Sequence, residues 1–129
     1  MERIPGQDDC QVANRERLVI VQIEDPEPMQ ELDQIAQVDG IDMLFFGPGD
    51  FSQGIGDPGN FDNPRIAEAR RQIAEITRRH GKFAGTVASY DTLPAMVAMG
   101  YQFISIGADV VALGEMFRRV AKAFAEIGS

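Results

Sequence analysis

Two acidic residues stand at the ends of two consecutive apolar runs. Leu18–Ile23 leads into Glu24, and Ile41–Phe46, continued by Gly47-Pro48-Gly49, leads to Asp50. Such runs are typical of buried parallel strands whose last residues are exposed at the carboxyl edge of a sheet. Adjacent parallel strands lie about 4.8 Å apart, so carboxylates at two strand ends can reach one hard cation. The sequence therefore favours a divalent metal ion held by Glu24 and Asp50, with solvated loop residues or helix caps as the alternative.

Composition narrows the partners that such a site can have. The chain has 129 residues, with 20 acidic and 12 basic side chains and a net charge of −8. This charge repels phosphate backbones and anionic lipids, so we expect neither nucleic acid nor a membrane as a partner. Cys10 is the only cysteine, and we find no apolar stretch near the roughly 18 residues of a membrane span and no signal-peptide core. We therefore expect a cytoplasmic protein.

A parallel sheet is needed to bring the two acids together, and strand-like and helix-like segments do alternate along the chain. Strands are expected over the two runs above and over residues 83–88 and 103–106. Helices are expected between them, because apolar residues recur at helical spacing after each strand. Their approximate ranges are 26–39, 64–80 and 91–99, followed by a closing helix from residue 109 with an apolar stripe at Phe117, Val120, Ala121 and Phe124.

Two segments depart from this alternation. Residues 1–17 lack clear periodicity, so we expect an irregular N-terminal segment before a domain over residues 18–129. Residues 47–63 contain four glycines before Asp57 and then Pro58-Gly59, which predicts irregular structure there.

The four βα units indicate the α/β class. An open four-stranded parallel sheet is one way to arrange them, whereas a closed (β/α) barrel needs eight strands and about 250 residues. This chain supplies half of that number.

The motifs around the two acids resemble a known family. Gln22-Ile23-Glu24, Phe46-Gly47-Pro48-Gly49-Asp50-Phe51-Ser52 and the segment Gly100–Asp109 are similar to the second half of the HpcH/HpaI aldolases. That family comprises metal-dependent, pyruvate-specific class II aldolases on a TIM barrel. The resemblance covers the chain from about Leu18 onward, and it implies a (βα)4 half-barrel made of strands five to eight.

The resemblance also implies roles for individual residues. Glu24 and Asp50 match the two metal-binding carboxylates, with Mg²⁺, Mn²⁺ or Co²⁺ as the cofactor. Gln22 matches a residue that contacts the substrate, and Gly49 matches a position whose backbone N–H helps to hold the pyruvate carboxylate. Asp50 belongs to the substrate site as well as to the metal site. Two carboxylates leave coordination positions open, where a 2-oxo acid can chelate the ion.

Two further groups that the resemblance implies have no counterpart in this chain. The family takes a histidine base and an arginine from the first half of the barrel, and no matching segment exists here. The only histidine, His80, stands where a helix should end, so we interpret it as a residue that complements the helix dipole. We therefore expect no catalytic residue in this chain.

The function implied is reversible cleavage of a 2-keto-4-hydroxy acid to pyruvate and an aldehyde. One alternative is a non-catalytic half-barrel that binds metal and 2-oxo acids or serves only in assembly. Another is an enzyme of the citrate-lyase or malyl-CoA-lyase type, although no basic cluster near the strand ends suits coenzyme A. The edges of an open half-barrel expose unpaired backbone groups, so we expect a homo-oligomer or a complementing N-terminal half as partner.

Overall fold

The computed structural model describes residues 12–13 and 15–127, and its centre is one parallel sheet of four strands. The strands lie side by side in the order of the sequence, and each neighbouring pair is parallel. They are β1 (Ile20–Ile23), β2 (Met43–Phe46), β3 (Phe83–Ala88) and β4 (Phe103–Ile106). The predicted α/β class and all four strands are confirmed, although β1 and β2 each begin two residues later than expected.

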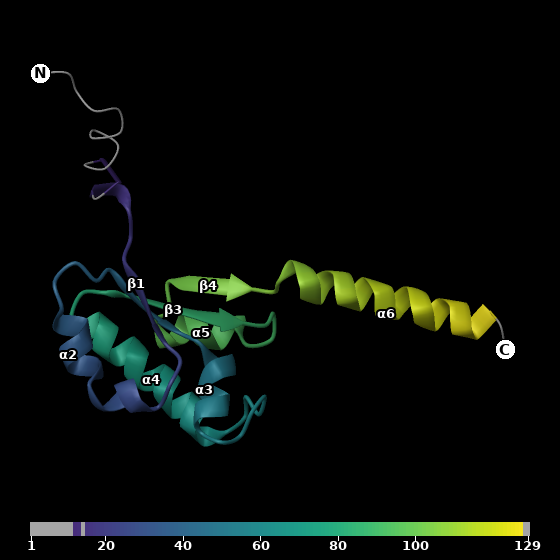
Figure 1. Cartoon of the computed structure of the whole chain (residues 1–129), viewed down its shortest axis with the longest axis horizontal. Coiled ribbons are helices and arrows are strands. Elements are labelled where there is room, and N and C mark those ends of the chain that lie inside the picture. The colour runs from purple at the N-terminus through teal and green to yellow at the C-terminus, as the bar shows by residue number, and fades with distance from the viewer. Residues whose placement is uncertain (1–11, 14, 128–129) are drawn as a thin grey trace, which may run out of the picture.

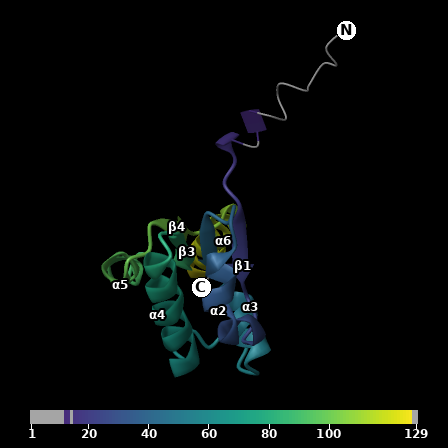
Figure 2. The same cartoon turned by 90° about the vertical axis from the view of Figure 1, so that its left-hand side faces the viewer.

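Helical elements connect the strands, and those before β4 cover one face of the sheet (Figure 1). They are η1 (Glu27–Gln30), α2 (Leu32–Gln37), α3 (Pro48–Gly54), α4 (Pro64–Arg79), α5 (Leu93–Met99) and α6 (Asp109–Ile127). Helices α2 and α4 lie against each other on the covered face (Figure 2). Among the described helices, none is long and apolar enough to cross a membrane.

The main core lies between the sheet and these helices. Ile23, Leu44 and Phe46 point to the helix side of β1 and β2, and each is at most 1% exposed. They pack on apolar residues of α2, α3 and α4, namely Leu32, Ala36, Phe51, Ile66, Ala69 and Ile73. This packing fixes the carboxyl ends of β1 and β2 next to each other, with Ile23 paired to Phe46.

The opposite face of the sheet is open. A groove on it is lined by Ile20, Gln22, Phe45 and Phe103, which alternate with the core residues along their strands. The rings of Phe45 and Phe103 meet edge to face with centroids 6.1 Å apart. They do so across Gly85 of β3, which is paired with both residues in the register. A glycine is needed at this point, because a Cβ on Gly85 would lie 2.6 Å from the Phe45 ring.

Our prediction that residues 47–63 are irregular is wrong for their first part, which forms α3. Pro48 stands at the first helical turn, where its missing N–H costs nothing. Phe51 is buried and its ring meets that of Phe46 with centroids 5.2 Å apart. Ser52 is also buried, and its hydroxyl donates to the Gly49 carbonyl and accepts from the Gly59 N–H. Burial of these two side chains thus stabilises a helix in a segment rich in glycine.

The predicted helix over residues 26–39 is present as two pieces. The first is the 3₁₀ helix η1, and the second is α2, separated from it at Glu31, whose φ of −114° is not helical. The Glu31 N–H donates to the Pro28 carbonyl at 3.0 Å and so closes the last turn of η1. Asp25 accepts a hydrogen bond from the Glu27 N–H and so caps η1.

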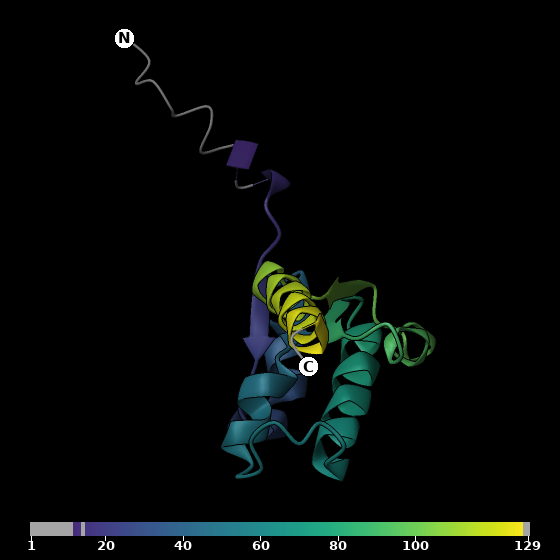
Figure 3. The ribbon, with the colours of Figure 1, turned by 90° about the vertical axis from the view of Figure 1, so that its right-hand side faces the viewer.

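Helix α6 extends away from the rest of the molecule in Figure 1 and is seen nearly end-on in Figure 3. No residue of α6 is buried. Six of its large apolar residues are 45% to 84% exposed and follow one another at spacings of three and four. They are Val110, Leu113, Phe117, Val120, Phe124 and Ile127. The apolar stripe predicted for the closing helix therefore exists, but it has no covering partner among the described residues.

Most of the N-terminal segment lies outside the described residues. Of residues 1–17, which we predicted to be irregular, positions 1–11 and 14 are not described. The described residues 12–13 and 15–16 are helical, and the Arg17 N–H donates to the Ala13 carbonyl at 3.0 Å.

Candidate functional site

Glu24 follows the last residue of β1 and is half-buried at the carboxyl edge of the sheet. Gln22 lies two residues earlier on the same face of the strand, and its Nε2 donates to Glu24 Oε1 at 2.5 Å. The carboxylate therefore has a defined partner before any ligand is considered.

Asp50 belongs to helix α3, which directly follows the neighbouring strand β2. The Gly47 N–H donates to the Ile23 carbonyl at 3.1 Å and so joins the end of β2 to the end of β1. Gly47 is the N-cap residue of α3, and Asp50 lies in the first turn of that helix. The Asp50 side chain is exposed, and its Oδ1 accepts from Gln53 Nε2 at 3.4 Å. Its negative charge also suits the helix N-terminus.

Gly47 lies directly under the side chain of Glu24 and is also the N-cap residue of the helix that carries Asp50. A Cβ on Gly47 would lie 2.7 Å from Glu24 Cγ and 2.9 Å from Glu24 Oε1, so the Glu24 side chain rests directly over this glycine. Asp50 follows three residues later in the chain. Gly49, which directly precedes Asp50, is exposed, and a Cβ added to it would have no atom within 4 Å. Because Gly49 lies in the first turn of α3, its backbone N–H has no acceptor within the helix.

The donor set at this edge is small and hard. Within residues 12–13 and 15–127, no group of three or more histidine, cysteine, aspartate or glutamate side chains gathers as a metal centre. Two carboxylates with a neighbouring amide are compatible with a divalent cation that keeps several positions for water or a ligand. Such a set fits Mg²⁺ or Mn²⁺ chemistry better than that of soft thiolate-binding metals.

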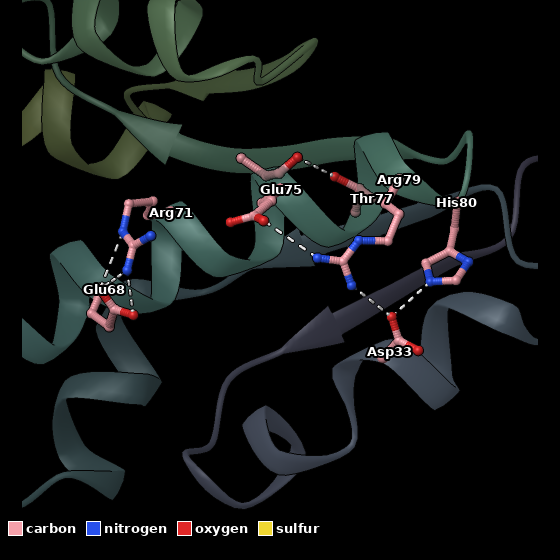
Figure 4. A network of polar contacts seen from close by, with 8 residues as sticks. Asp33, Glu68, Arg71, Glu75, Thr77, Arg79 and His80 are labelled. Carbon is pink, nitrogen blue, oxygen red and sulfur yellow. Dashed lines mark hydrogen bonds and ion pairs between the residues drawn. The ribbon is translucent and has the colours of Figure 1, made fainter.

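The structure places His80 at the end of α4, as we predicted. It is the C-cap residue, and its Nε2 lies 2.9 Å from Asp33 Oδ1 on α2 (Figure 4). Arg79 Nη1 also contacts Asp33 Oδ1, at 3.1 Å. The hydrogen bond from His80 lowers the pKa of the Asp33 carboxyl. His80 thus ties α4 to α2, and it is not among the residues that surround Glu24.

One arginine of α4 differs in burial from Arg71, Arg78 and Arg79, which are exposed. Arg70 is half-buried, and its Nε has no hydrogen-bond partner among the described groups. Burial lowers the pKa of its guanidinium. Tyr101, itself 3% exposed, donates from its hydroxyl to the Arg70 carbonyl at 2.9 Å. Helical spacing did not predict this burial, because the loop and strand residues that cover Arg70 come from distant parts of the chain.

The fold and this edge define an α/β protein of the barrel class, in which parallel strands carry their polar groups at the carboxyl ends. The sequence profile of one family, HpcH/HpaI aldolase/citrate lyase, matches residues 3–115. The chain therefore belongs to the HpcH/HpaI aldolase/citrate lyase family. This confirms the resemblance that the motifs around Glu24 and Asp50 indicated.

Individual relatives agree with this assignment. The chain is 35% identical over 123 residues to 4-hydroxy-2-oxo-heptane-1,7-dioate aldolase of Escherichia coli, which covers 95% of this chain and 46% of the relative. It is 33% identical to hydroxypyruvate/pyruvate aldolase of Pseudomonas aeruginosa over 87% of the chain and 42% of the relative. The HpcH/HpaI aldolase structure from Desulfitobacterium hafniense superposes with a TM-score of 0.84 at 25% identity, covering 97% of this chain and 49% of that one. The chain thus spans about half the length of the relatives that it matches.

Proposed function

We propose that this chain is the metal-binding half of a class II aldolase that cleaves a 2-keto-4-hydroxy acid to pyruvate and an aldehyde. The observation that carries the proposal is the arrangement at the adjacent ends of β1 and β2, where Glu24 follows β1 and rests over Gly47, and Asp50 lies in the first turn of the helix that Gly47 caps. Membership of an aldolase and lyase family supports the reaction class.

In this proposal Glu24 and Asp50 hold a Mg²⁺, Mn²⁺ or Co²⁺ ion. When bound, the ion supplies Lewis-acid stabilisation of the negative charge that develops on the 2-oxo acid as the carbon–carbon bond breaks. Gln22 and Asp50 contact the 2-oxo acid, and the Gly49 N–H donates to its carboxylate. These residues bind and orient the substrate, and none of them removes the proton from the hydroxyl group.

The base and the cationic group belong to another part of the assembled protein. His80 is engaged with Asp33 at the C-terminal end of α4, so we assign it no role in proton transfer. We propose that a complementing N-terminal half-barrel, or a second copy of the chain, covers the open face of the sheet at Ile20, Phe45 and Phe103. The single cysteine fits a reducing compartment, and we propose a cytoplasmic location.

Two alternatives keep the fold and change the function. A non-catalytic half-barrel would use the same residues only to bind metal and 2-oxo acids, or only for assembly. A lyase of the citrate-lyase or malyl-CoA-lyase type would use the same acids with a different substrate, since one fold hosts several chemistries. The metal and the 2-oxo acid are therefore tested separately from the cleavage step.

The first test is a calorimetric titration of the chain with Mn²⁺. We expect one site in the wild type and a strong loss of affinity in Asp50→Ala, because one of only two charged ligands is removed. Asp39→Ala is the control, since Asp39 is exposed and makes no hydrogen bond or ion pair with the described residues. Oxalate, which resembles the chelating end of a 2-oxo acid, should bind only with Mn²⁺ present. If Asp50→Ala binds Mn²⁺ as tightly as the wild type, the metal assignment is wrong.

The second test concerns cleavage. A missing general base typically costs about 10²–10⁴-fold in rate, so we expect retro-aldol activity to be absent or very slow in the isolated chain. Activity should rise when a separately expressed N-terminal half of a full-length relative is mixed with the chain. A fast metal-dependent rate from the chain alone would contradict the assignment of the base to another segment, and no oxalate binding with Mn²⁺ would favour a purely structural role.

A further inference from the structure

The Glu24 carboxylate is held from two sides before any cation is bound. On one side, Gln22 Nε2 donates to Oε1 at 2.5 Å. On the other, the Glu24 side chain lies over the Cα of Gly47, where an added Cβ would come within 2.7 Å of Cγ and 2.9 Å of Oε1. A real Cβ does not occupy such positions, so any side chain at residue 47 would displace the carboxylate.

The two contacts leave the two oxygens of Glu24 in different situations. Oε1 accepts from Gln22 and faces Gly47, whereas Oε2 has no hydrogen-bond partner among the described residues. The contacts of Oε1 restrict rotation of the carboxylate group, and Oε2 remains available to a ligand. Hydrogen-bonded ligands of this kind are oriented by their neighbours.

The glycine at position 47 is required for space and not for backbone conformation. Its φ is −101° and its ψ is 88°, so φ lies on the negative side that residues with side chains adopt. The six glycines with positive φ in the described part of the chain lie elsewhere. The Cβ of an alanine at position 47 would clash with the Glu24 side chain.

We propose that Gln22 and Gly47 are positioning residues for the Glu24 carboxylate, which they would hold in place for a cation bound by Glu24 and Asp50. The inference rests on the proposed function, and it gives Gln22 a role toward the metal ligand that is separate from its contact with the 2-oxo acid. It also predicts that these residues act when the metal is the only ligand present.

The clash at residue 47 falls on the side chain of Glu24, at Cγ and Oε1, and not on backbone atoms. The Glu24 side chain can rotate away in Gly47→Ala, so the fold should survive while the carboxylate loses its orientation. Changes in residues that orient metal ligands typically cost 10- to 100-fold in metal affinity. We expect a loss of that size for Gly47→Ala, and a loss in the same direction for Gln22→Met, which keeps the length of the side chain and removes the donor.

The test is Mn²⁺ titration of the whole chain, without any 2-oxo acid, in wild type, Gly47→Ala, Gln22→Met and Gly114→Ala. Gly114 in α6 is the control, because its added Cβ would meet only Arg118 Nη1, at 3.8 Å. Thermal melting of each metal-free variant separates loss of fold from loss of affinity. In addition, the NMR signals of the Gln22 side-chain amide in the metal-free chain report its hydrogen bond to Glu24.

We expect the Gln22 amide signals to move in Gly47→Ala and to stay in place in Gly114→Ala. The inference is overturned if Gly47→Ala keeps both wild-type Mn²⁺ affinity and the wild-type Gln22 amide signals. If the wild type itself binds no Mn²⁺, the proposed function fails, and the role of Gln22 and Gly47 toward a metal ligand fails with it. In that case the amide signals still decide whether the two residues hold the carboxylate.

Discussion

At the scale of single residues, the polar groups of this chain serve two kinds of task. Glu24 and Asp50 stand at the edge where the barrel class keeps its chemistry, and their surroundings are shaped by a glycine. Asp33 and His80 instead join two helices away from those acids, in the contact that Figure 4 shows (Figure 4). Acidic side chains therefore differ in role according to their place in the fold: Asp33 joins two helices, whereas Glu24 and Asp50 lie near the carboxyl edge of the sheet.

The contact between Asp33 and His80 leads to a prediction about acid stability. The pKa of Asp33 is lowered in the folded chain, chiefly by the hydrogen bond from His80. A carboxyl whose folded pKa is depressed stabilises the fold above its unfolded pKa, and this contribution is lost as the pH falls through the folded pKa. We expect Asp33→Asn to be less stable than the wild type at pH 7, by a small amount because the Asp33 side chain is half-exposed and its charge is screened by solvent.

The measurement is the melting temperature of both proteins between pH 7 and pH 2. The gap between them should begin to narrow below the ordinary aspartate value of 3.8 and close only below the lowered pKa of folded Asp33, where the wild-type carboxyl also becomes neutral. An unchanged gap at the lowest pH would show that the two helices are not joined by this charge. Asp39→Asn serves as the control, since Asp39 has no such partner among the described residues.

At the scale of elements, close contacts across the sheet decide which residues are allowed. Phe45 and Phe103 come from strands that are not neighbours, yet their rings meet because Gly85 on the strand between them has no side chain. A Cβ added to Gly85 would also lie only 2.8 Å from Met43 Sδ. The open face of the sheet therefore depends on one glycine of β3.

We accordingly expect Gly85→Ala to destabilise the chain through overpacking, by about 1–3 kcal/mol in the free energy of unfolding. The change is measured by urea denaturation, with Gly114→Ala as the control in an uncrowded position. Equal stability of Gly85→Ala and the wild type would mean that the Phe45 and Phe103 rings separate at no cost.

At the scale of the whole molecule, two apolar surfaces remain uncovered in the single chain. One is the groove on the open face of the sheet, and the other is the stripe along α6. The spacing of three and four residues along that stripe is typical of a helix that packs on another helix. Large exposed apolar surfaces of this kind mark sites of association.

We therefore expect the chain to self-associate at micromolar concentration in sedimentation velocity. Phe117→Glu should weaken association, because it places a charge in the middle of the stripe, where Phe117 is 59% exposed. Ala125→Glu introduces the same charge beside the stripe and is the matched control. A compact, stable monomer in the wild type would rule out this expectation.

The sequence by itself determined the strands, their order of appearance and the position of Glu24 at the end of β1, whereas Asp50 lies in the first turn of α3 and not at a strand end. It did so because each strand is a mainly apolar run that local inspection can detect, although one face of the sheet is open in this chain. The limits of α4 were equally readable, since Asn63 and Pro64 begin it and Gly81, with a φ of 65°, follows its end.

Only the tertiary structure decided how the ends of β1 and β2 are arranged. Helix α3 forms in a glycine-rich segment because Phe51 and Ser52 are buried by residues far away in the chain, a contribution that local propensity does not contain. The closeness of Glu24 to Gly47 likewise depends on the parallel register of two strands that are separated by a whole helical connection. Local sequence rules describe neighbours along the chain, whereas the setting of the two acids is made by neighbours in space.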